Sequence, residues 1–568
     1  MFAVRLANPK RITAADQCDC GYHWPRECPA SDHSGPSSGT DNTPPAILQG
    51  CKNYEDTLIE VHRSHQRQGL PISYFLVDSW WYGEREHGGV WMWEDTPTLV
   101  SDTFPGNATH PGMKRLSAEL GGLPFKAHAG GWSKGKGSDK PNPYFANPDY
   151  KFVTRGNTGV PQGPGLWNHV FRVNQDSWNL RAIKQDHMNE QLGMSECTST
   201  VNVARDWLKG MGDAALQQNF SIQCERTIFS SLCQRKGARS DSARLLAADC
   251  MTLPIITMNS ASIHASTHQR LGPDYLAGSN RGNWRIGDAA VFVWGVGLLP
   301  FKDTFLSNTS QAPPTHANTG TGTGGFKGFK EEAPTLHAIS SLLSAGPVSP
   351  SDGVDGANVP LLMSLCRADG KLLKPDKPAR SLDAQWLGRV FNSSAPSGTL
   401  WSTSTTINNK TWGYVLSVNS AEAWSADATT LNLPGGNEAS AGYSWARSPL
   451  LDPSLDSIEE FSEAAPLQLA PQPHGGKDAY SDDVFTYYST APKLSNGMVL
   501  LGETGKMVPV SSIRFADVDA SASDSISVSL LGAAGENVAV AYLAKGSKSV
   551  AKKSCTMSAE GTCALVLK

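Results

Sequence analysis

The segment YEDTLIEVHRSHQRQGLPISYFLVDSWW, residues 54–81, decides the fold class of this 568-residue chain. In its first half, apolar residues at Leu58, Ile59 and Val61 stand among charged residues, which predicts a helix that ends at Gly69. Its second half is a short apolar run that ends in Asp78, which predicts a buried strand with polar groups at its carboxyl end. A helix followed directly by a buried strand is typical of a parallel α/β unit.

The same unit recurs along the chain. Further short strands with polar residues at their ends are predicted in residues 122–133 and 180–190, and another begins at residue 220, after an amphipathic helix at 201–219. Two more helix–strand units end at Asp303 and at Asp352. We therefore predict an α/β fold, a (β/α)8 TIM barrel over residues 46–360, with its catalytic face at the carboxyl ends of the strands.

Three other segments break this pattern. Residues 1–45 are rich in Ser, Gly, Pro and Asp, so we expect an irregular N-terminal segment, in which no first barrel strand is recognisable. Residues 224–249 are weakly periodic and are interpreted as an insertion. Over residues 385–568, short β-rich segments between turn residues predict a C-terminal antiparallel β domain, sandwich-like, in which Cys555 and Cys563 can bridge a hairpin.

The composition argues against two classes of partner. A net charge of −4 with a pI near 6.4 disfavours nucleic acids and anionic membranes, both of which attract a basic surface. No stretch reaches the roughly 18 apolar residues of a transmembrane helix. The 16 tryptophans favour a carbohydrate partner, because the C–H faces of sugars stack on indole rings, although packing in a core explains them equally well. The sequence carries no signature of an oligomeric state.

Asparagine sequons give a hint of localisation. The five Asn-x-Ser/Thr sites favour a secretory or extracellular route, although residues 1–10 do not contain the continuous apolar run of a signal peptide. These sites are Asn107, Asn219, Asn308, Asn392 and Asn409.

Three polar patches carry the chemistry. They are Asp78 with Trp80 and Trp81, Lys184 with Asp186, and Arg270 with Asp274. Each alone is an ordinary helix cap or ion pair. The intervals between them each hold two βα units, so the patches should fall on alternate strands and converge at one mouth of the barrel. Hydrolysis of a glycosidic bond needs one ionised and one protonated carboxyl group, and Lys184 favours the ionised form of Asp186.

Other candidate residues are weaker. His128 and Trp132 follow the strand predicted in residues 122–133, where they can line a sugar pocket or simply pack. His264 and His268 are four residues apart, as metal ligands on one helix face are, but no third ligand accompanies them, so a structural role is favoured. We predict neither a metal nor a cofactor.

Together, the three patches resemble the motifs of the glycoside hydrolase clan that contains α-galactosidases, α-N-acetylgalactosaminidases and raffinose-synthase-like proteins. Asp78-Ser79-Trp80-Trp81 is similar to that clan's Asp-rich segment, Lys184-Gln185-Asp186 to its Lys-x-Asp nucleophile motif, and Arg270 with Asp274 to its Arg-x-x-x-Asp acid/base motif. The resemblance spans about residues 50–360. It implies that Lys184 and Arg270 bind substrate hydroxyls and that Asp78 binds the sugar at the cleaved bond. Ser79 departs from the second Asp that is usual in α-galactosidases.

Three hypotheses follow from these residues. The first is a retaining exo-glycoside hydrolase of α-linked sugars, α-galactosidase-like, with Asp186 as nucleophile and Asp274 as general acid/base. The second is a raffinose-synthase-like enzyme in which a sugar hydroxyl replaces water in the second step. The third is an inactive barrel that only binds carbohydrate.

Overall fold

The structure is a computed structural model, and the part of the chain that it describes comprises several ranges. They are residues 21–23, 53–77, 81–84, 89–95, 104–134, 142–186, 188, 191, 193–224, 266–271, 283–295, 297–309, 331–391, 398–433, 441–447, 458–472 and 480–568.

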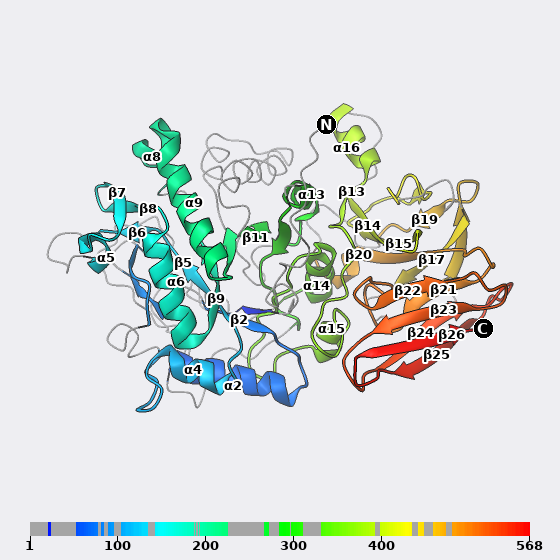
Figure 1. Cartoon of the computed structure of the whole chain (residues 1–568). Coiled ribbons are helices and arrows are strands. Elements are labelled where there is room, and N and C mark those ends of the chain that lie inside the picture. Colours follow the sequence, from blue (N-terminus) through cyan, green and yellow to red (C-terminus); the bar gives the residue numbers. More distant parts are fainter. Residues whose placement is uncertain are drawn as a thin grey trace.

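A seven-stranded parallel sheet forms the centre of the first half of the chain (Figure 1). Its order is β1 (Gly21–His23), β2 (Tyr74–Val77), β5 (Phe125–Ala129), β9 (Leu180–Gln185), β10 (Ser221–Cys224), β11 (Ser266–Leu271) and β12 (Leu299–Lys302). Every neighbouring pair is parallel. Beyond β12, Phe305 forms a parallel bridge with Pro350, which adds an eighth chain segment to the sheet. Closure of this segment onto β1 as a complete barrel stays a prediction.

Two features of the sheet correct the sequence analysis. Residues 1–45 were expected to be irregular, but β1 lies there and pairs with β2 from Gly21↔Tyr74 to His23↔Leu76. Between β2 and β9 the chain also builds a second sheet that was not predicted. Its order is β3 (Gly83–Glu84), β4 (Val90–Met92), β6 (Trp132–Ser133), β8 (Thr158–Gln162) and β7 (Lys151–Arg155).

Helices cover the outer face of the parallel sheet. The helix predicted from Leu58, Ile59 and Val61 is confirmed as α2 (Tyr54–Arg67), and all three side chains are buried in one core cluster with Phe75 of β2. The Asn53 side chain caps its N-terminus by accepting the amide of Asp56 at 2.9 Å. The other helices of the first half are α4 (Met113–Glu119), α5 (Pro143–Ala146), α6 (Gly165–Trp178), α8 (Ser195–Ser199) and α9 (Val201–Gln217).

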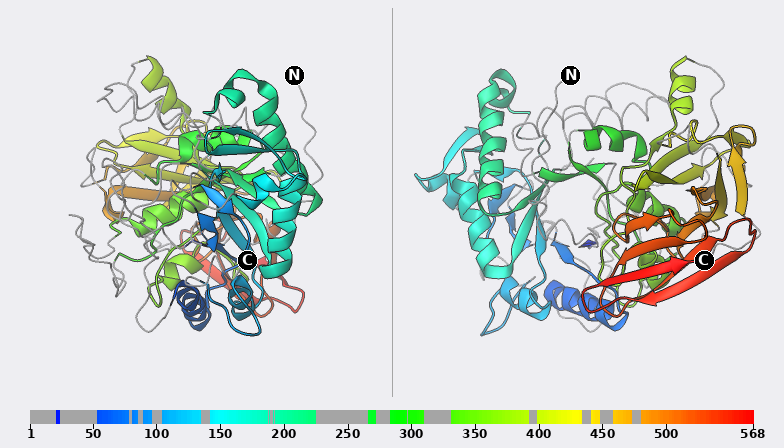
Figure 2. Two further views of the ribbon diagram at one scale, coloured as in Figure 1. Left: turned by 90° about the vertical axis from the view of Figure 1, so that its left-hand side faces the viewer. Right: turned by 45° about the vertical axis from the view of Figure 1, so that its right-hand side comes forward.

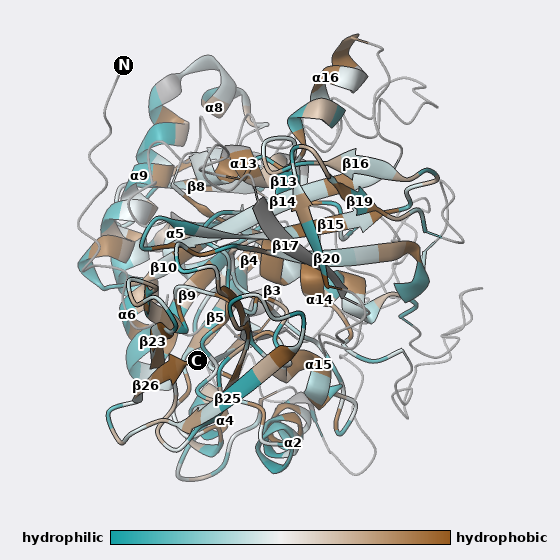
Figure 3. Ribbon diagram, turned by 90° about the vertical axis from the view of Figure 1, so that its right-hand side faces the viewer, coloured by the Kyte–Doolittle hydropathy of each residue, from teal (hydrophilic) through white to brown (hydrophobic). Residues whose placement is uncertain are grey.

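The helices that follow β11 along the chain lie toward the C-terminal region. They are α13 (Gly287–Gly295), α14 (Pro334–Leu343), α15 (Val359–Met363) and α16 (Asp383–Phe391). In the right-hand view of Figure 2, the green helices lie between the cyan helices and the red strands. Helix α16 stands out from the surface and exposes Leu387, Val390 and Phe391 (Figure 3). No helix in the described ranges combines the length and the apolarity that crossing a bilayer requires.

The predicted antiparallel character of the C-terminal region is confirmed. Its largest sheet has the order β13 (Arg380–Ser381), β14 (Thr399–Ile407), β15 (Lys410–Val418), β20 (Phe485–Pro492), β17 (Ala441–Arg447) and β18 (Ile458–Ser462), beside the pair β16 (Trp424–Ala426) and β19 (Leu467–Leu469). Two three-stranded sheets follow, β21 (Val499–Glu503), β24 (Asn537–Leu543) and β25 (Val550–Thr556), and β22 (Phe515–Asp519), β23 (Ile526–Leu531) and β26 (Thr562–Leu567). The Cys555–Cys563 disulfide joins β25 to β26 and so links these two sheets.

One hydrophobic core connects the C-terminal sheets to the helices that follow β12, with Leu336 of α14 and Trp412 of β15 in the same cluster. Polar contacts cross the same boundary. The Asp482 carboxylate accepts the amides of Thr335 and Leu336 at 3.0 and 3.1 Å and thereby caps α14, which has no cap of its own. The Tyr480 hydroxyl donates to Glu331 at 2.5 Å, just before that helix.

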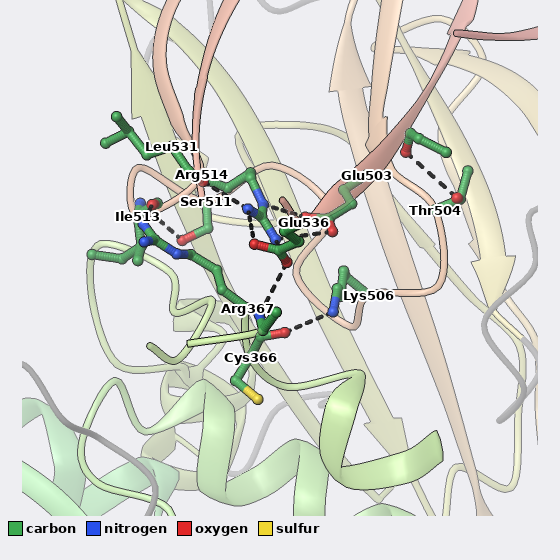
Figure 4. A network of polar contacts seen from close by, with 12 residues as sticks. Cys366, Arg367, Glu503, Thr504, Lys506, Ser511, Ile513, Arg514, Leu531 and Glu536 are labelled. Carbon is green, nitrogen blue, oxygen red and sulfur yellow. Dashed lines mark hydrogen bonds and ion pairs between the residues drawn. The ribbon is translucent and has the colours of Figure 1, made fainter. Parts of the chain in front are cut away.

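A buried arginine anchors the last strands (Figure 4). Arg514 is fully buried between Glu503 and Glu536, with its Nε 2.7 Å from Glu503 Oε2 and its Nη1 3.0 Å from Glu536 Oε2. Nearby, Lys506 donates to the carbonyl of Cys366 at 2.6 Å. The charge cluster therefore holds the C-terminal strands against the segment that follows α15.

Candidate active site at the strand ends

The inner face of the parallel sheet is polar rather than aliphatic. Register pairs His128 with Lys184, Lys184 with Gln223, and Gln223 with His268, so these side chains share one face. All four are buried. Barrel interiors usually hold branched aliphatic residues, so a run of charged and polar side chains marks this face as the candidate site.

The predicted spacing of the three patches is confirmed at the level of strands. Strands β2, β9 and β11 are the second, fourth and sixth in the sheet, so the patches follow alternate strands. Lys184 and Asp186 lie at the end of β9, and Arg270 lies on β11. Asp78, Trp80 and Asp274 lie outside the described residues, and the pairing of Asp186 with Asp274 stays a prediction.

Asp186 is held at the end of the fourth strand by contacts with the third. Its amide donates to the carbonyl of Ala129 at 2.8 Å, and the Gln185 side chain donates to the carbonyls of Ala129 and Gly130 at 3.2 and 3.3 Å. Its carboxylate Oδ2 lies 3.5 Å from Nε2 of His128. The sequence analysis placed Asp186 and His128 separately, and the structure brings them together.

Arg270 has a partner that the sequence analysis did not identify. Its Nη1 lies 3.3 Å from Oδ2 of Asp303, and both side chains are buried. Asp303 follows β12, the strand next to β11, so the ion pair joins two neighbouring strand ends. The sequence analysis named Asp303 only as the end of a predicted strand, and no recognisable motif around it indicated a role in the site.

Deeper on the inner face, three side chains form a compact cluster. Lys126 Nζ lies 2.8 Å from Gln223 Oε1 and 2.7 Å from His268 Nε2. Burial, and then the charge of Lys126, hold the pKa of His268 well below its usual range, so the ring is neutral. His268 lies on strand β11 and not on a helix, so the shared helix face considered for His264 and His268 does not form at His268, and His264 lies outside the described residues. Within the described ranges no His, Cys, Asp and Glu group is arranged to hold a metal ion.

Two candidate substrate-binding tryptophans, Trp81 and Trp132, lie in the core, and for Trp132 packing was the alternative that the sequence left open. Trp81 is 0% exposed and packs edge-on against Trp93, and Trp132 is 1% exposed and packs against Trp167. The indole N–H groups of Trp81 and Trp93 both point at the carbonyl of His128, at 3.4 and 2.8 Å. The structure thus places Trp81 behind the strand end, where it fixes the backbone of His128, and brings neither Trp81 nor Trp132 to the site.

Lys302 is buried on the other face of β12, behind the site. Its Nζ donates to the carbonyls of Asp303 and Thr304 at 2.8 and 3.0 Å. Burial lowers the pKa of Lys302 to about 7, although the negative charges of Asp303 and Glu331 oppose that shift. The folded protein therefore binds this proton less tightly than the unfolded chain does.

A Lys302→Met variant should show the cost of burying this lysine as a change in how the free energy of unfolding depends on pH. The folded pKa of Lys302, about 7, lies below its ordinary value of 10.5, so the unfolded state binds more protons between these values and stability rises with pH. From pH 7 to pH 9, the wild type should gain about 2 kcal/mol of unfolding free energy relative to the variant. Urea unfolding at both pH values measures the difference. The exposed Lys548→Met variant serves as control and should follow the wild type, whereas parallel curves for Lys302→Met would contradict the expectation.

Solved structures similar to this chain include glycoside hydrolases. A glycoside hydrolase family 5 structure from Bacteroides vulgatus matches with 8% identity and a TM-score of 0.36, over 77% of this chain and 86% of that chain. Isomaltulose synthase from Erwinia rhapontici matches with 9% identity and a TM-score of 0.41, over 84% and 100%. Gamma-CGTase from alkalophilic Bacillus clarkii matches with 9% identity and a TM-score of 0.38, over 97% and 83%. Neither a protein-family model nor a curated protein matches the sequence.

Proposed function

We propose that the protein is a retaining glycoside hydrolase that removes α-linked terminal sugars by double displacement, as α-galactosidases do. The observation that carries the proposal is the position of Asp186. It follows Lys184 by two residues at the end of the fourth parallel strand, on a polar inner face, two strands away from Arg270. This is the placement that a barrel enzyme needs for a nucleophile at the mouth of its site.

The proposed reaction has two steps. In the first, the Asp186 carboxylate attacks the anomeric carbon and the bond to the departing oxygen breaks while Asp274 protonates that oxygen. In the second, Asp274 takes a proton from water, the water oxygen attacks the anomeric carbon, and the bond to Asp186 breaks. Lys184 and Arg270 would hold substrate hydroxyls, with Asp303 orienting Arg270 through their 3.3 Å ion pair.

A covalent label on Asp186 is the direct test. A 5-fluoro glycosyl fluoride of α configuration, in galacto and gluco forms, should add the mass of one fluoroglycosyl group to the intact protein. The ring fluorine slows both steps, whereas the anomeric fluoride is a good leaving group that keeps the first step faster than the second. Peptide mapping should place the added mass on Asp186, and the Asp186→Asn variant should stay unlabelled. Labelling of Asp303 instead would identify Asp303, at the end of another strand, as the nucleophile. Absence of any label with both sugars, together with no turnover of aryl α-glycosides, would favour the barrel that only binds carbohydrate.

A further inference from the structure

Three side chains from consecutive strand ends of the parallel sheet form a line that ends at Asp186. Tyr82 comes from the segment after β2, His128 from β5 and Asp186 from the end of β9. The Tyr82 hydroxyl lies 2.9 Å from Nδ1 of His128, and Nε2 of His128 lies 3.5 Å from Oδ2 of Asp186. Tyr82 and His128 are each 4% exposed, and their rings are parallel within 4°. The imidazole thus joins a phenol on one side to the proposed nucleophile on the other.

The contacts of Tyr82 set the direction of these interactions. The Gly130 amide donates to the Tyr82 oxygen at 3.3 Å, so one lone pair of that oxygen is occupied and its own proton can point at Nδ1. When Nδ1 accepts, the neutral ring carries its proton on Nε2, the nitrogen that faces Asp186. A doubly protonated ring would instead donate from Nδ1, and the phenol proton would have to turn toward another acceptor.

The charges around His128 also affect whether its imidazole is neutral or doubly protonated. Lys126 on the same strand and Lys184, the register partner of His128, share the inner face with the ring, and their positive charges disfavour an imidazolium. The Asp186 carboxylate favours it. The indole N–H groups of Trp81 and Trp93 hold the backbone carbonyl of His128 in place. The imidazole therefore stays beside these charged groups.

We propose that Tyr82 keeps His128 as a neutral Nε2–H donor, and that His128 thereby positions the Asp186 carboxylate without neutralising its charge. The role of Asp186 in this inference rests on the proposed function. An N–H donor orients one carboxylate oxygen and leaves the charge available for attack on the anomeric carbon. An imidazolium at the same place would form a full ion pair with the carboxylate and weaken it as a nucleophile. His128 is therefore a positioning residue, and Tyr82 guards its protonation state.

The Tyr82→Phe variant tests whether Tyr82 controls the protonation state of His128, because it keeps the aromatic ring and removes only the hydroxyl group. Its kcat/KM should stay within about threefold of the wild type at pH 8. At pH 5 it should be at least about tenfold lower than in the wild type, because an imidazole without the Tyr82 hydroxyl beside it takes up a second proton more readily as the pH falls. His128→Gln keeps an N–H donor and should retain at least about tenfold more activity than His128→Phe. Tyr487→Phe, which removes a buried hydroxyl bonded to the Met507 carbonyl in the C-terminal region, is the matched control and should follow the wild-type pH profile.

Nitrogen-15 NMR of labelled histidine tests the protonation state without any activity. In the wild type, the His128 signal, assigned by its loss in His128→Gln, should show protonation on Nε2 alone from pH 5.5 to pH 8. In Tyr82→Phe the same ring should become doubly protonated within that range. An Nδ1–H tautomer, titration in the wild type, or an unchanged pH profile of Tyr82→Phe would overturn the proposal. If no glycoside is hydrolysed, the proposed function fails and the NMR result still decides the state of His128.

Discussion

Replacing Asp186 with alanine is expected to lower kcat on the best aryl α-glycoside substrate by about 10⁴-fold. Double displacement has no first step without the carboxylate, because nothing else forms the covalent bond to the anomeric carbon. Sodium azide should restore part of the activity, since the anion fits the space of the missing carboxylate. Azide would then attack the anomeric carbon from that side, release the aryl alcohol and leave a β-glycosyl azide as product, which chromatography and NMR can identify.

The matched control for this variant is Asp213→Ala. Asp213 lies on α9, where it pairs with Lys209 at an exposed position four residues away, and its loss should leave kcat within about twofold of the wild type. A kcat for Asp186→Ala close to that of the wild type would show that Asp186 is not the nucleophile. A large loss without azide rescue, and with reduced thermal stability, would indicate a structural role for this carboxylate instead.

Replacing Arg514 with methionine is expected to lower the free energy of unfolding by about 3–5 kcal/mol. The guanidinium is fully buried and holds two carboxylates at once. Burial raises the pKa of Glu503, whereas at Glu536 the hydrogen bonds and charge of Arg514 outweigh burial and hold the pKa below its usual range. Without the arginine both carboxyl groups would stay buried and lose the cation that compensates them. Urea unfolding at pH 7 measures the loss.

Two further arginine variants calibrate this result. Arg63→Met removes an exposed ion pair with Glu119 and should cost less than about 1 kcal/mol. Arg514→Lys keeps the charge but not the planar fork that reaches both carboxylates, so its stability should lie between those of the wild type and Arg514→Met. A change below 1 kcal/mol in Arg514→Met would show that the cluster does not hold the C-terminal strands in place.

The fold was predictable where local pattern and final structure agree. Residues 54–77 became α2 and β2 because an amphipathic helical pattern and the short apolar run that follows it pack into one core. Strand β1 has three residues, Gly21–His23, and owes its conformation to pairing with β2 rather than to any pattern of its own. The short strands β3 and β6 escaped prediction for the same reason, since each has two residues.

The candidate site was predictable only in part. The sequence of one strand shows which side chains share a face, but it does not show which residues of other strands lie beside them. Lys184 and Asp186 were predicted because they stand at the end of a predicted strand in a Lys-x-Asp pattern. The partnership of Arg270 with Asp303, and that of His128 with Asp186, depends on which strands are neighbours. Trp81 shows the opposite failure, since its residue type suggested a sugar platform and packing buried it completely.

The cap that Asp482 provides for α14, with the Tyr480–Glu331 hydrogen bond beside it, has a practical consequence. A shortened polypeptide ending near residue 360 would retain every strand of the parallel sheet, yet the first amides of α14 would lose the Asp482 carboxylate and Glu331 would lose the Tyr480 hydroxyl. We therefore expect the shortened polypeptide to be less stable than the full chain. Grafting the N-terminal half onto a foreign partner would require that partner to supply an equivalent carboxylate and phenol.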